Sequence, residues 1–278
     1  MKLFISCDME GISGVTGSDE TDPQKEAYQR CRRLMVGDVN AAIEGALAAG
    51  VSEILVNDSH DGMRNIMIEE LNPKAHLISG VLKPLSMMQG IDSTFDMAMF
   101  VGYHAMAGAA AAVMNHTVYG RMVDDAWING SLVGETAINA GIAGYFGVPV
   151  GAVTGDDKLA SEATKLLGSI ESAVVKKGID RYTAECLPLT TSREYIKQTA
   201  KRAVERRKDF KPLKHSSPVT FKVRFASTSE AATACWLPTV KQEDPRTVSF
   251  TFDDYIDSFR MFHAVLSLAS TAQDRIFG

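Results

Sequence analysis

The sequence predicts an α/β protein built on a mostly parallel sheet flanked by helices, with a smaller C-terminal α+β part. Two observations support this fold class. In the first half of the chain, short apolar runs alternate with segments of helical periodicity, which is the pattern of a βαβ parallel sheet. The second half changes to a basic helical segment, two strand-like runs and a long closing helix. We therefore expect an α/β domain over residues 1–165 and a C-terminal α+β part over residues 166–278.

The first half supplies most elements of the predicted parallel sheet. Residues 3–7 form an apolar run that is typical of a buried strand. Asp22-Pro23 resembles a helix N-cap followed by a proline in the first turn. Apolar side chains at helical spacing then continue to Gly50, where a helix can end. Further elements are expected as strands at 53–57, 76–79 and 96–103 and as a short helix at 66–71.

The middle of the chain predicts strands around turns over residues 117–133, because Asn129-Gly130 is a strong hairpin signal. A Lys- and Arg-rich segment at 193–214 is interpreted as an amphipathic helix with a solvated face, and a patch for an anionic partner is the alternative. The remaining expected elements are helices at 134–146, after 155–157 and at 253–271, and strands at 149–154, 219–225 and 247–252.

Composition and charge exclude several classes of protein. A chain of 278 residues, 45% hydrophobic and 23% charged, can bury a large core without disulfides. The net charge of −5 argues against general nucleic-acid binding and against a polybasic membrane anchor. Two uncharged stretches, 97–120 and 136–155, are interpreted as buried strands and helices rather than as membrane spans.

Cysteine usage and the N-terminus indicate the compartment. The four cysteines are scattered and form no CxxC pair, which suits a reducing environment better than a disulfide scaffold. The apolar run at the N-terminus is too short for a secretory signal before the first acidic residue. We expect a cytoplasmic protein that binds neither a membrane nor a nucleic acid.

Polar side chains follow three of the expected strands, at the point where each strand ends. Asp8 and Glu10 come after the first strand, Asp58 and His60 after the second, and His104 after the strand at 96–103. Ligands of open parallel sheets bind outside the carboxyl ends of the strands, so these side chains are expected at one edge. Each one alone also has a structural interpretation: Asp8 as the end of a strand, Glu10 as a surface acid, Asp58 and His60 as part of a turn, and His104 as a half-buried histidine. Together they form the ligand set that zinc or manganese prefers, and a carboxylate among them can bridge two metal ions.

Two further residues are candidates for the same site. Glu135 lies near the start of an expected helix and can complete the metal site, although an acid in a first helical turn is also favoured by the helix dipole. His116 lies in an expected loop, so an acid/base role and a plain surface position are both open. The other histidines have no such context and are expected to be structural: His76, His215 and His263.

Four separated segments closely resemble the DppA-type D-aminopeptidases, a family of zinc peptidases. They occur in the family's order and spacing, and the similarity is densest over residues 1–155. The segments are Asp8-Met9-Glu10-Gly11-Ile12-Ser13-Gly14, Val56-Asn57-Asp58-Ser59-His60, Gly102-Tyr103-His104-Ala105 and Val133-Gly134-Glu135.

The resemblance implies two zinc ions in each subunit. It implies that Asp8 bridges them, that His60 and His104 are the remaining ligands of one ion, and that Glu10 and Glu135 are those of the other. His116, in the run Val113-Met114-Asn115-His116, is similar to the catalytic histidine of the family. The resemblance therefore marks the α/β part of the chain as the metal-binding part.

The activity implied by the resemblance is that of a zinc metallopeptidase. Such an aminopeptidase hydrolyses short peptides with an N-terminal D-residue, such as D-Ala-D-Ala, through a di-zinc-activated hydroxide. The implied assembly is a homodecamer of two stacked pentameric rings. The alternatives are another di-metal amidohydrolase, a phosphoesterase using Arg64 or Arg121, an aminopeptidase with an L-residue preference, and a metal-stabilised ring that acts as a scaffold.

Overall fold

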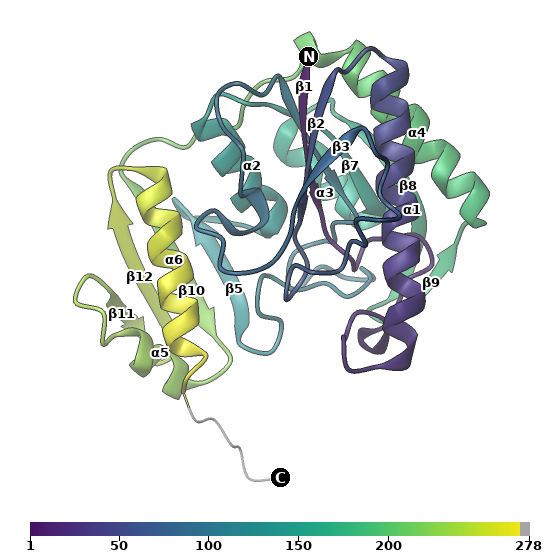
Figure 1. Ribbon diagram of the computed structural model, residues 1–278. Helices are drawn as coiled ribbons and strands as arrows, with labels where there is room; N and C mark the ends of the chain where they lie inside the picture. The colour runs from purple at the N-terminus through teal and green to yellow at the C-terminus, as the bar shows by residue number, and fades with distance from the viewer. Residues whose placement is uncertain (273–278) are drawn as a thin grey trace.

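A seven-stranded sheet forms the centre of the computed structural model, which describes residues 1–272. The strand order of this sheet A is β3-β2-β1-β4-β7-β8-β9, and all neighbours are parallel except β8 and β9. Figure 1 shows β1, β2 and β3 beside one another. The strands are β1 (Lys2–Cys7), β2 (Glu53–Asp58), β3 (Ala75–Ile78), β4 (Met97–Val101), β7 (Val150–Asp156), β8 (Glu171–Asp180) and β9 (Thr183–Cys186).

Helices flank sheet A. The chain steps from β1 to β2 in one direction along the sheet and from β7 to β8 in the other. Because such crossovers are right-handed, their helices α1 and α3 lie on opposite faces. Helix α4 packs beside α1, as Figure 1 shows. The helices are α1 (Glu26–Ala48), α2 (Glu135–Tyr145), α3 (Asp157–Leu167) and α4 (Leu189–Glu205), with 3-10 turns η1 (Ser18–Glu20), η2 (Ser86–Met88) and η3 (Arg207–Asp209).

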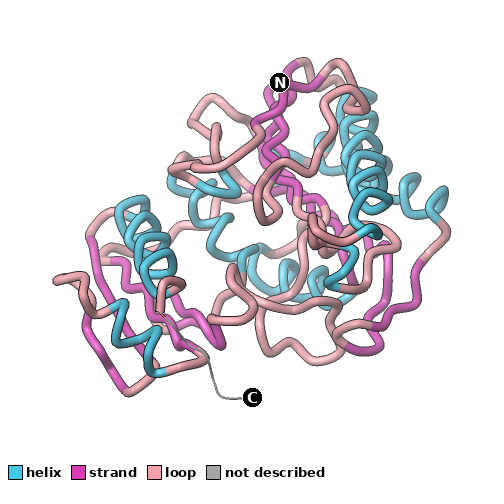
Figure 2. Tube along the Cα trace, turned by 60° about the horizontal axis from the view of Figure 1, so that its bottom comes forward, coloured by secondary structure: helices cyan, strands magenta, loops and turns pink. Residues whose placement is uncertain are grey.

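A second sheet, sheet B, is antiparallel and has the strand order β11-β12-β10-β5-β6. Helices α5 and α6 pack against it, and Figure 2 shows this sheet and its helices beside the larger body. Its elements are β5 (Val123–Ile128), β6 (Ser131–Leu132), β10 (Val219–Phe225), α5 (Thr228–Ala234), β11 (Lys241–Asp244), β12 (Thr247–Phe252) and α6 (Tyr255–Ala269).

The predicted fold class is confirmed, since a mostly parallel sheet flanked by helices is accompanied by a smaller α+β part. The two sheets are interleaved along the chain. Strands β5 and β6 leave the first half of the chain to join sheet B, whereas β8 and β9 extend sheet A beyond residue 165. The division into residues 1–165 and 166–278 therefore does not coincide with the division between the sheets.

Three local expectations were wrong. Residues 66–71 form turns rather than a helix: Glu70 N and Leu71 N both donate to Met67 O, and Pro73 then prevents the turn from continuing as a helix. Helix α1 begins at Glu26 rather than after Asp22, since Lys25 N closes a turn on Asp22 O at 2.9 Å. Helix α4 ends at Glu205, and the basic segment continues as η3 and irregular chain.

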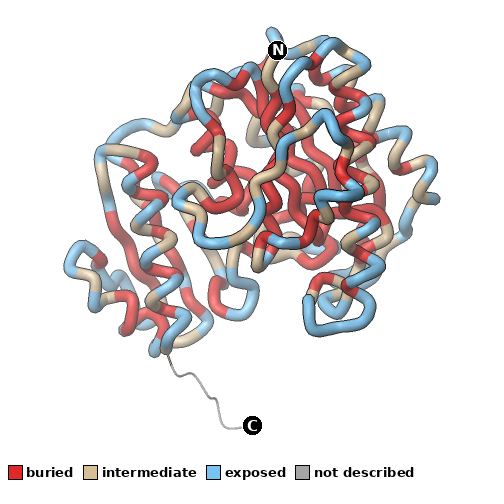
Figure 3. Tube along the Cα trace, viewed as in Figure 1, coloured by how far each residue is buried: buried red, intermediate tan, exposed pale blue. Residues whose placement is uncertain are grey.

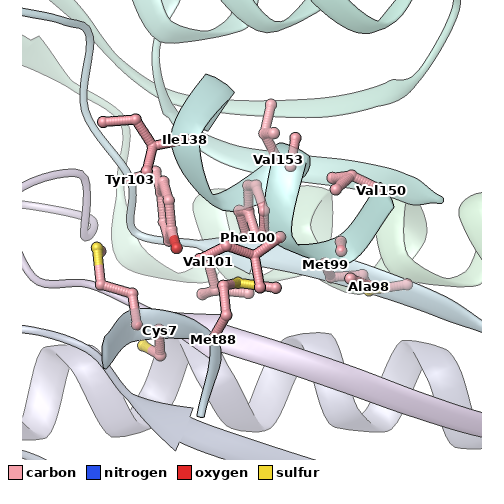
Figure 4. Packing of buried hydrophobic residues seen from close by; sticks show 14 of the residues in the cluster. Cys7, Met88, Ala98, Met99, Phe100, Val101, Tyr103, Ile138, Val150 and Val153 are labelled. Atoms are coloured by element: carbon pink, nitrogen blue, oxygen red, sulfur yellow. The ribbon is translucent and has the colours of Figure 1, made fainter. Parts of the chain in front are cut away.

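The hydrophobic core fills the space between sheet A and its helices. Figure 3 shows the central strands as mostly buried. In Figure 4, Phe100 and Tyr103 lie in this core; their rings stack at 4.5 Å, and the Tyr103 hydroxyl contacts Ser6 Oγ at 2.7 Å and accepts from Asn139 Nδ2. The uncharged stretches at 97–120 and 136–155 contribute β4, α2 and β7 to this core, as expected. Within residues 1–272, no helix is long and apolar enough to cross a membrane.

The loop after β1 lies directly against the end of β4. Asp8 N donates to Val101 O and Gly11 N donates to Gly102 O, both at 2.8 Å. A Cβ atom on Gly11 would overlap the carbonyl oxygen of Tyr103, so only glycine allows this approach. The position of Asp8 and Glu10 therefore depends on the missing side chain at residue 11.

Replacing Gly11 with alanine is expected to lower the free energy of unfolding by about 3 kcal/mol, because the new methyl group must displace backbone rather than a flexible side chain. Chemical denaturation measures the change. The control is Gly17→Ala, since a Cβ there meets nothing within 4 Å and should change stability by less than about 0.5 kcal/mol. Equal stability of the two variants would contradict the packing described for Gly11.

Candidate metal centre

The site predicted from the strand ends lies at the carboxyl edge of sheet A. Asp8 and Glu10 follow β1, His60 follows β2 and His104 follows β4. The direction of the crossovers reverses between β1 and β4, and ligands of open α/β sheets bind at such a switch point. The strand order therefore explains why residues from distant parts of the chain meet here.

Asp8 is at the centre of the cluster. Its Oδ1 atom lies 3.4 Å from His60 Nδ1, and its Oδ2 atom lies 3.5 Å from His104 Nε2. Glu10 Oε2 lies 3.1 Å from His60 Nδ1 as well. The two oxygens of Asp8 thus face two different imidazoles, which is the arrangement that a bridging carboxylate requires.

Glu135 and His116 complete the cluster. Glu135 is the first residue of α2, and its Oε1 atom accepts from Val118 N at 2.8 Å. The same oxygen lies 3.3 Å from His104 Nε2 and 3.7 Å from His116 Nε2. The rings of His104 and His116 stack with their centroids 4.0 Å apart. All six residues singled out from the sequence as ligands or catalyst are therefore neighbours.

Each of the three imidazoles has one ring nitrogen on a backbone carbonyl. A carbonyl only accepts, so this nitrogen carries the proton and the other nitrogen faces the carboxylates. Metal-binding histidines are held by carbonyl groups in the same way, which fixes their orientation. The pairs are His60 Nε2 with Thr21 O at 3.0 Å, His104 Nδ1 with Ala105 O at 3.0 Å, and His116 Nδ1 with Met114 O at 2.8 Å.

The cluster has the composition and the charge of a cation site. Asp8, Glu10 and Glu135 are all buried, and buried carboxylates are costly unless a positive group compensates them. His104 Nε2 is also buried and makes no hydrogen bond to any residue from 1 to 272. The ligand atoms of Asp8, Glu10 and His104, and those of His104, His116 and Glu135, lie within 4.8 Å of one another. These residues fit a divalent metal ion.

Without a metal ion, protons bound to Asp8 and His104 compensate the negative charge of the cluster. Burial and the neighbouring Glu10 raise the pKa of Asp8 to about 8. Burial lowers the pKa of His104, but Glu135 and Asp8 outweigh it and raise that pKa to about 10. The cluster therefore binds protons at neutral pH that a metal ion would have to displace.

Asp58, which the sequence placed among the strand-end acids, does not face the cluster. Its carboxylate accepts from Asn65 N at 2.6 Å, Ile66 N at 2.7 Å and Asn65 Nδ2 at 2.7 Å. The same Nδ2 also donates to His60 O. Asp58 thus stabilises the loop that carries His60, which is the turn interpretation of this residue.

A cleft of about 940 Å³ opens onto the cluster. Asp8, Glu10 and Glu135 form part of its wall. Apart from Arg121, its other walls were not singled out from the sequence, because they come from loops, from α2 and from α6, which packs on sheet B. They include the cations Lys83, Arg121 and Arg181 and the helix residues Phe259 and His263. His263 is therefore a wall residue of the cleft, whereas His76 is exposed on β3 and His215 stacks on Tyr255.

A parallel sheet with carboxylates and imidazoles at its switch point is typical of metal-dependent hydrolases. The family model of the D-aminopeptidases matches residues 1–264. The D-aminopeptidase of Bacillus subtilis (strain 168) is 37% identical over 270 residues, 97% of this chain and 98% of that protein.

A solved structure agrees with the sequence comparison. It is the Zn-dependent D-aminopeptidase DppA from Bacillus subtilis, a self-compartmentalizing protease, with a TM-score of 0.96 and 36% identity over 99% of this chain and 100% of that one. The chain therefore belongs to the D-aminopeptidase family, which confirms the resemblance and favours a peptidase over the other hydrolases and the scaffold considered above.

Zn²⁺ binding is expected to weaken as the pH falls from roughly 8 to 6, by about tenfold per pH unit for each proton displaced. The reason is that Asp8 and His104 hold protons in the metal-free site, since both pKa values lie at or above this range. Competition with a chelator of known affinity at several pH values measures the effect. An affinity independent of pH would contradict the ligand assignment.

Proposed function

We propose that the protein is a zinc-dependent aminopeptidase that removes the N-terminal D-residue from short peptides such as D-Ala-D-Ala. The observation that carries the proposal is the buried cluster of three carboxylates and three imidazoles at the wall of the cleft. Family membership and the D-aminopeptidase activity of the relatives support it.

We propose that Asp8, Glu10, His60, His104 and Glu135 hold two zinc ions, with Asp8 bridging them. The contacts pair His60 with Glu10 and His104 with Glu135, on either side of Asp8. This pairing differs from the resemblance, which assigns both histidines to one ion. The chemistry supplied by such a pair of bound ions is a nucleophile available at neutral pH and a polarised carbonyl oxygen.

His116 is proposed as the proton carrier. Burial and the neighbouring His104 lower the pKa of His116, so that its ring is neutral at neutral pH. Nδ1 donates to Met114 O, which leaves Nε2 free to accept a proton. The side chain is 18% exposed and lines the cleft, whereas that of His104 is 1% exposed. His116 Nε2 can therefore receive a proton and deliver it to the departing amine.

The charges of the cleft suit a short peptide with two free ends. Its acidic residues favour a cationic amino terminus. Lys83, Arg121 and Arg181 line the same cleft and can attract the carboxylate at the other end. A peptide of two or three residues is therefore a better fit than a long neutral chain.

The zinc-loaded protein is expected to release the N-terminal residue of D-Ala-D-Ala much faster than that of L-Ala-L-Ala, and to leave N-acetylated D-Ala-D-Ala intact. Metal analysis and an amino-acid release assay test this expectation. Faster cleavage of the L-peptide would assign the other stereochemical preference. Cleavage of a phosphate ester and of no peptide would overturn the proposed function.

His116→Ala is expected to reduce kcat by about 100-fold to 10,000-fold while the zinc content stays the same, because a proton carrier is lost but no ligand. The zinc measurement is needed because His116 Nε2 lies close enough to Glu135 to serve as a ligand. The matched control is His76→Ala on the exposed strand β3, which should leave kcat unchanged. Full hydrolysis by His116→Ala would exclude the role given to His116.

We further propose a homodecamer of two stacked pentameric rings in the cytoplasm. The self-compartmentalizing character of the structural neighbour supports a closed assembly. In such an assembly the cleft faces an inner chamber, which restricts access to small peptides. Sedimentation of a monomer at micromolar concentration would exclude the decamer.

A further inference from the structure

Lys176 is a buried lysine that plays no part in the proposed reaction. It lies on β8, is 1% exposed and is among the largest fully buried side chains of the protein. Lysine is almost never fully buried without compensating partners, because removing its charge from water is costly. The position of this side chain therefore calls for a specific explanation.

The Lys176 ammonium group is enclosed by backbone carbonyls of one loop. Nζ donates to the carbonyl oxygens of Glu10, Ile12 and Val15, the three acceptors that its three N–H groups can serve. Over residues 1–272, no carboxylate lies within ion-pair distance of this Nζ atom. The charge is thus used entirely to hold the backbone of the segment that carries Glu10.

The contact spans an unusual distance across the sheet. In the strand order of sheet A, β8 is separated from β1 by β4 and β7. The loop after β1 therefore crosses the ends of β4 and β7 before it reaches Lys176. The first part of this loop is held by the hydrogen bond from Gly11 N to Gly102 O. The next part is held by Ser13 N, which donates to the buried carboxylate of Asp38 at 2.9 Å. Lys176 is the only cation among these three anchors.

We propose that Lys176 is a positioning residue of the metal centre, which fixes the loop from Asp8 to Val15 so that the Glu10 carboxylate faces His60. This inference rests on the proposed function, since it takes Glu10 as a metal ligand. Lys176 Nζ holds the Glu10 carbonyl oxygen from the side of β8. This contact fixes the backbone position of Glu10 and therefore the position from which its carboxylate extends. A compact ammonium can serve three converging acceptors, whereas a planar guanidinium cannot.

The test replaces Lys176 with methionine, which keeps the volume of the stem and removes the charge and the three donors. Val175→Ala is the matched control, because Val175 is the adjacent, fully buried residue of the same strand and its truncation weakens the core without touching the loop. Zinc affinity is measured by chelator competition, zinc content by elemental analysis and overall stability by thermal unfolding.

Lys176→Met is expected to bind one of the two zinc ions about 10-fold to 100-fold more weakly, as is found when groups that orient metal ligands are removed. kcat should fall with it, while KM changes little. Val175→Ala should lose thermal stability and keep the zinc affinity of the unmodified protein. If Lys176→Met does not fold, Lys176→Gln, which keeps an amide donor, replaces it in the same measurements.

The outcomes separate the two proposals. If the Lys176 variants have the same zinc affinity and kcat as Val175→Ala, the positioning role is overturned and the proposed function stays intact. Failure of the unmodified protein to bind zinc would overturn the proposed function itself. Weaker zinc binding by both Lys176→Met and Val175→Ala would show that general loosening of the strand is the cause, and would also overturn the positioning role.

Discussion

The structure depends on the burial of three carboxylates in one small volume. Asp8, Glu10 and Glu135 are all buried close to one another, so each must face a positive or proton-bearing group. The imidazoles of His60 and His104 provide these groups, because the neighbouring carboxylates raise the pKa of both rings, whereas the neutral His116 turns an acceptor nitrogen toward the cluster. One ring nitrogen of each imidazole donates to a backbone carbonyl, which fixes the orientation of the ring. The imidazoles are therefore held in place before any ligand binds.

Much of this arrangement could be predicted from the sequence, because it follows from topology. Parallel strands place their carboxyl ends at one edge, so Asp8, His60 and His104 had to approach one another once the strands were recognised. The apolar runs of β1, β2 and β4 are unambiguous, and they were predicted within two residues at each end. The position of Glu135 could also be predicted, since it begins a helix with a clear apolar pattern.

Other features could not be predicted because they depend on tertiary contacts. Lys176 stands in a strand whose exposed and buried residues alternate irregularly, and only the loop after β1 explains its burial. Asp58 holds the backbone N–H groups of Asn65 and Ile66 instead of facing the cluster, and no local pattern shows this contact. The contribution of α6 to the cleft wall could not be predicted either, since no local pattern shows which face of a helix meets a distant loop.

The interleaving of the two sheets affects the order in which the chain can fold during synthesis. His116 and Glu135 lie on either side of the β5–β6 hairpin, and β5 pairs with β10 near the C-terminal end of the chain. During synthesis on the ribosome, the hairpin has no partner strand until β10 has emerged. The hairpin that joins His116 to Glu135 therefore gains its partner strand only after about four-fifths of the chain has been translated.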